Sequence, residues 1–507
     1  MDDQLPHHPT DAAFHSANRD KEIERCLRSA LHAYTARWLP LFMQRESSGC
    51  WVVRCDEIAL ACWRKARKDM LKVINRPSYR SVLALYLFGQ TPVPVGIPQE
   101  EELDGINGVV CSQTAFLHVQ QLRERLRSCQ FNGSEVSAWS DTATSDIATP
   151  SENPTEEYLN LETRAFWAAV TWATSDSMTL NFRSNLSPGL KGACWEPVWQ
   201  VARAFLVASF HDRTEAWRRK GFRVSDDVTP QITSAASICA IYTWQTIASL
   251  KEALREGVEE ATVQSAWKAL VDIVDVFKTT IHPILNNLER QLHFVGQVDR
   301  LNWYEIVLVY YLGFLILIDA LEAANRPDLL HGLAQMSLEA EHECFNVLNF
   351  GLESTYTIDP GLSQHQSQRD SATVGASSVS TGEAEAEAEA EFPTQPVTVS
   401  LVAIDPYPHH VVAAVRLMNK TFLRQYYDGT IKREAYLHLS STLLKALDQL
   451  PQNTKAVYSA KENLRRSLCE FDAVAAAADH DREFEVVQNV PATAGTTPRT
   501  WPPPAYR

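Results

Sequence analysis

The sequence lacks the short motifs that mark common catalytic sites, and it is poor in glycine. Only 19 glycines occur among 507 residues, and there is no Gly-x-Ser-x-Gly elbow, no His-Glu-x-x-His pair and no glycine loop that could cradle a phosphate. One Glu-x-x-His pair, Glu339 and His342, has no second copy of the kind that a di-iron bundle requires. These absences predict no catalytic residues, no bound metal and no cofactor, so we expect that the chain is not an enzyme.

The ten cysteines lack the paired spacing of a zinc or disulfide framework. Cys50, Cys55 and Cys62 lie closest together, and the next cysteine is Cys111. A zinc thiolate site needs cysteines paired a few residues apart, so that one turn offers two ligands to the metal. The first residues also contain no apolar signal core. Together these features predict a reducing compartment, the nucleus or the cytoplasm.

Long apolar runs and excess positive charge are absent as well. The longest apolar run, residues 306–318, ends well short of the ~20 residues that span a bilayer, so it predicts a core helix and no membrane segment. Lysine and arginine number 47 against 62 acidic residues, a net charge of −15. This balance is wrong for a protein whose bulk surface meets nucleic acid, and we assign no DNA-binding residues.

The sequence is instead rich in helical periodicity. Trp63, Ala66, Met70 and Val73, for example, fall on one face of a helix, whereas the alternation typical of sheets is scarce. The predicted fold class is all-α, a large multi-helix regulatory domain with two low-complexity linkers. The expected parts are a disordered N-terminus (1–19), a first helical part (20–131), a linker (132–156), a helical core (157–355), a low-complexity acidic linker (356–400), C-terminal helices (401–478) and a disordered tail (479–507).

The segment 162–205 combines dense aromatic residues with one acid and one base. Its pattern predicts a helix that protein surrounds on most sides, with Phe166 and Trp167 packed inside. Asp176 and Arg183 fall together on the flank of this helix. They could orient an effector in an apolar pocket, or they could form a buried structural ion pair, and we favour the ion pair.

A second charged feature is the stripe formed by Arg64, Lys68 and Lys72, which are spaced four residues apart. Such a stripe could contact phosphates or an acidic partner. No aromatic residues interleave with it, so we favour a solvated helix face.

Four segments resemble one known family. Residues 162–188, together with 27–42, 80–89 and 303–317, are similar in order and spacing to the middle homology region of fungal zinc-binuclear-cluster transcription factors, and the resemblance covers roughly residues 20–350. It implies transcription regulation, with zinc only in an N-terminal DNA-binding module that this chain lacks. Two interpretations stay open: an independent regulator that works through partners, or a truncated gene product whose zinc module was lost from the gene or missed in its prediction. It also implies other transcription regulators or coactivators as partners, homo- or heterodimers, and only indirect contact with DNA. The alternative is a helical small-molecule-binding protein or an enzyme of unknown reaction, for which a convergent polar pocket would be the distinguishing feature.

Overall fold

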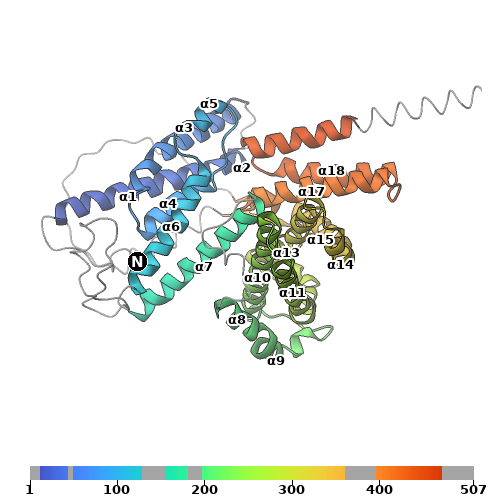
Figure 1. The fold of residues 1–507 in the computed structure, drawn as a ribbon. Helices are drawn as coiled ribbons and strands as arrows, with labels where there is room; N and C mark the ends of the chain where they lie inside the picture. The colour runs from blue at the N-terminus through green and yellow to red at the C-terminus, as the bar shows by residue number, and fades with distance from the viewer. Residues whose placement is uncertain (1–11, 44–48, 128–154, 181–196, 360–395, 471–507) are drawn as a thin grey trace, which may run out of the picture.

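The computed structural model describes residues 12–43, 49–127, 155–180, 197–359 and 396–470 (Figure 1). Within these residues the chain is helical apart from one two-stranded sheet, which confirms the all-α prediction. Most of the predicted linkers, residues 1–11, the predicted disordered tail and Arg183 lie outside the described residues. The predicted disordered N-terminus (1–19) is wrong for residues 12–19, which form the first turns of a helix.

The N-terminal helices pack around a hydrophobic cluster of their own. In this cluster Cys26, Met70, Leu85 and Phe116 are fully buried. Ser78 caps one of the helices, because its hydroxyl accepts a hydrogen bond from the backbone N–H of Ser81 at 3.1 Å. The elements of this part are α1 (Ala12–Thr35), η2 (Ala36–Trp38), α2 (Leu39–Met43), α3 (Gly49–Val73), α4 (Tyr79–Gly89), α5 (Gln99–Leu103) and α6 (Gly108–Arg127).

The middle of the chain forms a larger helical core around one long apolar helix, α13. Its elements are α7 (Glu156–Thr179), α8 (Pro197–Ala204), the π-helical turn η5 (Phe205–Phe210), α9 (His211–Arg213), η6 (Ala216–Arg218), α10 (Thr229–Glu256), α11 (Glu260–Val276), the π-helical turn η7 (Phe277–Ile281), α12 (His282–Glu289), η8 (Leu292–Phe294), α13 (Gln297–Ala323), α14 (Pro327–Gly332) and α15 (Ala334–Glu353).

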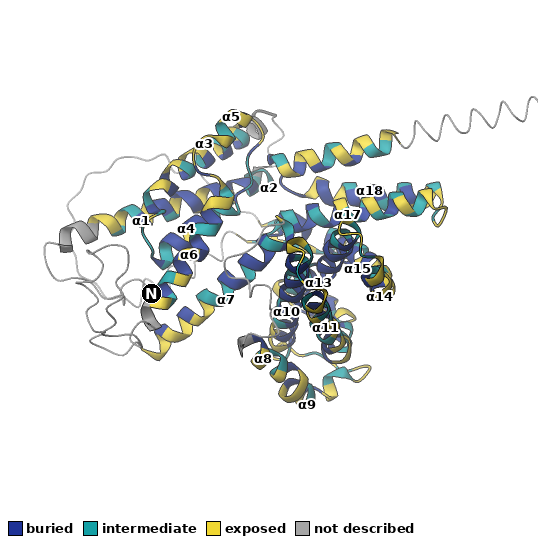
Figure 2. Cartoon of the chain, in the orientation of Figure 1, coloured by how far each residue is buried: buried dark blue, intermediate teal, exposed yellow. Residues whose placement is uncertain are grey.

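Helix α13 is the centre of this core and packs against α10 and α15. By length and composition alone it could cross a membrane, but most of its apolar stretch is buried inside the protein, as the dark blue ribbon in Figure 2 illustrates. Gly313 permits the close approach of α10, since a Cβ atom at this position would lie 2.5 Å from Nε1 of Trp244. The predicted core helix at residues 306–318 is therefore confirmed.

Helix α7 joins the two hydrophobic clusters. Ala169 and Ala173 belong to the N-terminal cluster, whereas Val170 and Met178 belong to the larger core. In Figure 1 the helix runs between the blue N-terminal helices and the green core helices. The prediction that protein surrounds this helix on most sides holds only for its second half, residues 169–178. Residues 159–161 and 163–164 are exposed, Phe166 and Trp167 are half-buried, and the helix ends at Thr179.

The C-terminal part contains the sheet and two further long helices. Strands β1 (Thr355–Ile358) and β2 (Val397–Ser400) pair antiparallel, with Thr355 opposite Ser400. These strands correct the predicted linker 356–400, whose two ends are ordered β-structure. The chain continues through η9 (Val402–Ile404), α17 (Pro408–Tyr427), α18 (Arg433–Gln449) and a helix over residues 455–470.

Candidate functional site

Residues 401–410, which we call the junction segment, lie where the N-terminal helices meet the core. Two side chains of α1 and η2 donate hydrogen bonds to the backbone carbonyl of Pro406, Tyr34 through its hydroxyl at 3.1 Å and Arg37 through Nη2 at 2.9 Å. Trp38 Nε1 donates to the carbonyl of Ala403 at 3.1 Å. The N-terminal helices are thus attached to a segment that lies more than 360 residues away in sequence.

Arg37 is a buried cation in this junction, with only 3% of its surface exposed. Its guanidinium carbon lies 4.0 Å from the ring centroids of both Tyr34 and Trp38. Burial lowers the pKa of Arg37, and the nearby Asp405 carboxylate opposes that shift. The two aromatic rings and the carboxylate replace part of the hydration that the cation has lost.

Asp405, which is buried, and Glu305, which is half-buried, are carboxyl groups that influence each other electrostatically. Oδ1 of Asp405 accepts from the backbone N–H of Tyr407 at 2.7 Å, and Oδ2 accepts from the Tyr304 hydroxyl at 3.2 Å. Burial raises the pKa of Asp405, while these hydrogen bonds and Arg37 lower it. Burial raises the pKa of Glu305, and the Asp405 charge raises it further. The environment therefore favours an ionised Asp405 beside a protonated Glu305.

Both carboxyl groups line a cavity of about 250 Å³ between α7, α10, α13 and the junction segment. Its walls are largely apolar and aromatic. The polar side chains that line it come from four separate parts of the sequence, and they include Ser175, Ser237, Glu305, Asp405, Tyr407 and His410. A mostly apolar cavity with a few convergent polar groups is the usual form of a small-molecule site.

Two adjacent histidines at the start of α17 add hydrogen-bonding groups without adding charge. The Ser175 hydroxyl lies 2.7 Å from Nε2 of His410 and 3.4 Å from Nε2 of His409. Burial lowers the pKa of His409 to about 4 and that of His410 well below its usual value. Both rings are consequently neutral at pH 7.

Asp176, one of the residues singled out by the sequence, lies beside this site and lines a neighbouring cavity of about 190 Å³. Its side chain is 1% exposed, and Oδ1 accepts a hydrogen bond from Nε2 of Gln90 at 3.0 Å. Burial raises its pKa to about 6. Arg183 lies outside the described residues, so the structure places one member of the predicted pair and leaves the choice between effector site and ion pair open.

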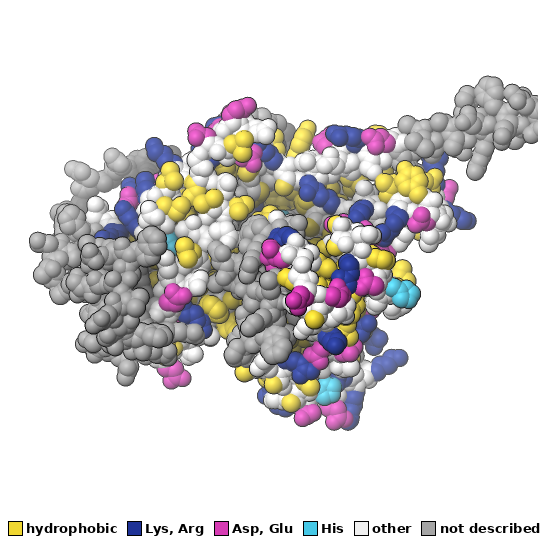
Figure 3. Space-filling view, in the orientation of Figure 1, with side chains coloured by type: hydrophobic (Ala, Val, Ile, Leu, Met, Phe, Trp, Pro, Cys, Tyr) yellow, Lys and Arg dark blue, Asp and Glu magenta, His cyan; other side chains and the backbone are white. Residues whose placement is uncertain are grey.

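The predicted basic stripe has acidic neighbours. Nε of Arg64 lies 2.6 Å from Glu101, and Nζ of Lys72 lies 2.6 Å from Asp69, whereas Lys68 is exposed. On the face drawn in Figure 3, basic and acidic side chains are likewise interspersed. Paired and exposed charges of this kind are typical of a solvated helix face.

Within the described residues, no three or more His, Cys, Asp or Glu side chains form a group that could hold a metal ion. No family model matches the sequence. No curated protein matches it either. One solved structure, described as a circular tandem repeat protein with novel repeat topology and enhanced subunit contact surfaces, aligns over 92% of this chain and 89% of its own at 10% identity, with a TM-score of 0.23. An overlap of that size supports neither a shared fold nor a function.

The raised pKa of Asp176 predicts a pH-dependent stability. The folded protein binds this proton more tightly than the unfolded chain, whose aspartate pKa is about 3.9, so stability is lost as pH rises from about 4 to 6. Asp176→Asn keeps an acceptor for Gln90 and removes the buried charge. We expect it to be more stable than the wild type by about 3 kcal/mol at pH 7 and equal to it below pH 4.

Urea unfolding at pH 4, 5, 6 and 7 measures this difference. Asp275→Asn, on the exposed face of α11, is the matched control and should leave the pH profile unchanged. A stability difference at position 176 that stays constant across the pH range would contradict the assignment.

Proposed function

We propose that this chain is an effector-sensing regulatory domain that acts in transcription. The observation that carries the proposal is the cavity beside the junction segment, with its convergent polar groups. The resemblance of residues 20–350 to the middle homology region of fungal transcription factors supplies the regulatory context. In this proposal the chain works in the nucleus or the cytoplasm through other regulators or coactivators, as a homo- or heterodimer, and contacts DNA only indirectly.

The cavity lies where a bound ligand would affect the docking of α1 on the junction segment. Asp405 and Tyr407 line the cavity, and the carbonyl of Pro406 between them accepts the hydrogen bonds from Tyr34 and Arg37. A ligand that contacts the junction segment therefore acts on the residues that dock α1. A difference in affinity between the docked and undocked states would shift the balance between them.

The carboxyl pair favours a second candidate, an enzyme that transfers protons. Two carboxyl groups whose surroundings push their pKa values apart can serve as acid and base. Chemical analysis of a bound ligand after incubation separates the two functions, because a sensor returns the ligand unchanged.

Filling the cavity is expected to abolish effector control. Ser237 of α10 lines the cavity, whereas Ser234, one turn earlier, is exposed. In a reporter assay with the full chain fused to a heterologous DNA-binding domain, Ser237→Leu should change the output about fivefold or more, the lower range of an allosteric coupling. Ser234→Leu should behave as the wild type. Equal output from all three proteins, with comparable melting temperatures, would rule out regulation through this cavity.

A further inference from the structure

We infer that the cavity binds a small organic cation, an ammonium group on an aromatic or aliphatic skeleton, with its nitrogen against Glu305 and Asp405. This inference rests on the proposed function, because it names the chemical class of the effector. It follows from the charges around the cavity, from its aromatic walls and from its size.

The charges around the cavity are unbalanced toward the negative. Two carboxyl groups line it, and its described lining includes no lysine or arginine. Arg37 lies near Asp405, behind the lining, and Asp405 also accepts two hydrogen bonds. Glu305 is different, because within the described residues no hydrogen bond or ion pair reaches its carboxyl group. The two histidines at this site are neutral, so they supply no compensating positive charge.

A bound cation would supply the missing partner. In the empty protein the simplest way to keep Glu305 inside the cavity is to leave it protonated, which agrees with its raised pKa. When an ammonium ion enters at neutral pH, the Glu305 proton leaves to solvent, and the ammonium N–H groups donate to the two carboxylates. Charge is conserved, since one cation replaces one proton. An anion would face two carboxyl groups and is disfavoured.

The walls and the size of the cavity fit an amine with a ring or a short chain. Trp172, Trp244 and Tyr407 contribute to the lining, and aromatic side chains attract cations once both are removed from water. A dry cavity of about 150 Å³ accommodates benzene. The cavity here, about 250 Å³, therefore has room for a ring with a short charged arm.

The test compares amines with neutral compounds of the same skeleton. The full chain is titrated with butylamine, benzylamine and phenethylamine, and in parallel with butanol, benzyl alcohol and phenethyl alcohol, by calorimetry at pH 7 in two buffers of different ionisation enthalpy. We expect at least one amine to bind tenfold or more tightly than its alcohol, with proton release. In Glu305→Gln that preference should disappear, and in Glu343→Gln, on α15 outside the cavity, it should persist.

The outcomes separate this inference from the proposed function. Suppose that the alcohols bind as tightly as the amines and that Ser237→Leu abolishes their binding. This result would overturn the cation assignment and leave effector sensing in place. Unchanged amine affinity in Glu305→Gln, or no binding by any probe at millimolar concentration, would also overturn it. Conversely, amine binding could require Glu305 while Ser237→Leu leaves the reporter output unchanged. This pair of results would support the cation site and reject its regulatory role.

Discussion

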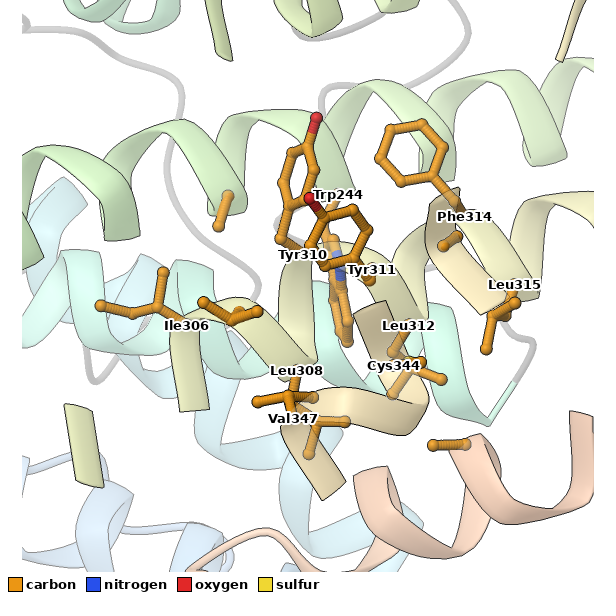
Figure 4. Packing of buried hydrophobic residues seen from close by; sticks show 14 of the residues in the cluster. Trp244, Ile306, Leu308, Tyr310, Tyr311, Leu312, Phe314, Leu315, Cys344 and Val347 are labelled. Carbon is orange, nitrogen blue, oxygen red and sulfur yellow. The ribbon is translucent and has the colours of Figure 1, made fainter. Parts of the chain in front are cut away.

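Tyr310→Ala is expected to lower the free energy of unfolding by about 3–5 kcal/mol, as for other large aromatic residues removed from a core. The Tyr310 ring is 1% exposed and stacks on Phe277, with ring centroids 3.5 Å apart. It also meets the edges of Tyr311 and Phe314, at 5.1 and 5.2 Å (Figure 4). Since α13 is at the centre of the core, few neighbouring side chains can collapse into the space left. Urea unfolding of the full chain measures the loss.

Tyr310→Phe is the matched control, because it keeps the ring and removes the hydroxyl. Within the described residues that buried hydroxyl has no hydrogen-bond partner. Removing an unsatisfied polar group is neutral or stabilising, so we expect this variant to stay within about 1 kcal/mol of the wild type or to exceed it. A phenylalanine variant as unstable as the alanine variant would show that the hydroxyl, not the ring packing, stabilises this region.

The helical core was predictable because burial leaves a clear periodic signal in long helices. The apolar run at residues 306–318 is bounded by Glu305 and Asp319, and it became the central helix. Periodicity was less reliable near helix ends. Leu180 falls on the same face as Val170 by spacing, but it is 49% exposed, because α7 ends one residue before it.

Trp167 illustrates a second limit of the sequence pattern. We expected it inside the core, but it is only half-buried and packs edge-on against Trp199 at a centroid distance of 5.2 Å. Helical spacing identifies which residues share a face. It does not reveal how far a neighbouring helix covers that face, which depends on tertiary packing. The short strands were missed for a related reason, since four residues carry too little alternation to stand out within a polar segment.

The cavity was not predictable, because its residues are brought together by tertiary contacts alone. Tyr304 and Asp405, which share a hydrogen bond, are 101 residues apart in sequence. In the sequence Glu305 appeared only as the boundary of an apolar run. Asp176 was found because, in the sequence pattern, it forms an acid–base pair with Arg183 in an otherwise apolar segment, and it does lie beside the cavity. A charged residue directly before the apolar run of a core helix is the signal that could have identified Glu305.

Arg37 is the side chain with the largest expected effect on the stability of the junction segment. It donates to the Pro406 carbonyl, lies between two aromatic rings and holds a positive charge near Asp405. Burying the Arg37 guanidinium costs free energy, which opposes the stabilisation from these contacts. The cost is increased because Nε and Nη1 have no hydrogen-bond partner within the described residues. Removing Arg37 would take away the hydrogen bond to Pro406, the two cation–π contacts and the nearby positive charge that lowers the pKa of Asp405, although within the described residues no ion pair joins Arg37 to Asp405. A hydrogen bond from a charged group contributes about 1.5–3 kcal/mol, and a desolvated cation–π contact about 2 kcal/mol.

Arg37→Ala is therefore expected to destabilise the protein by about 3 kcal/mol at pH 8. The stability difference between Arg37→Ala and the wild type should become smaller as pH falls. Arg37 lowers the pKa of Asp405, so in the variant this carboxyl takes up a proton at higher pH, and protonation removes the uncompensated charge. Arg64→Ala, which breaks an exposed pair with Glu101, is the matched control and should cost less than about 1 kcal/mol at any pH.

Urea unfolding at pH 5 and pH 8 measures both variants. Two results would contradict this role of Arg37 beside Asp405. One is a loss in the free energy of unfolding for Arg37→Ala that is as small as the loss for Arg64→Ala, and the other is a loss that does not depend on pH.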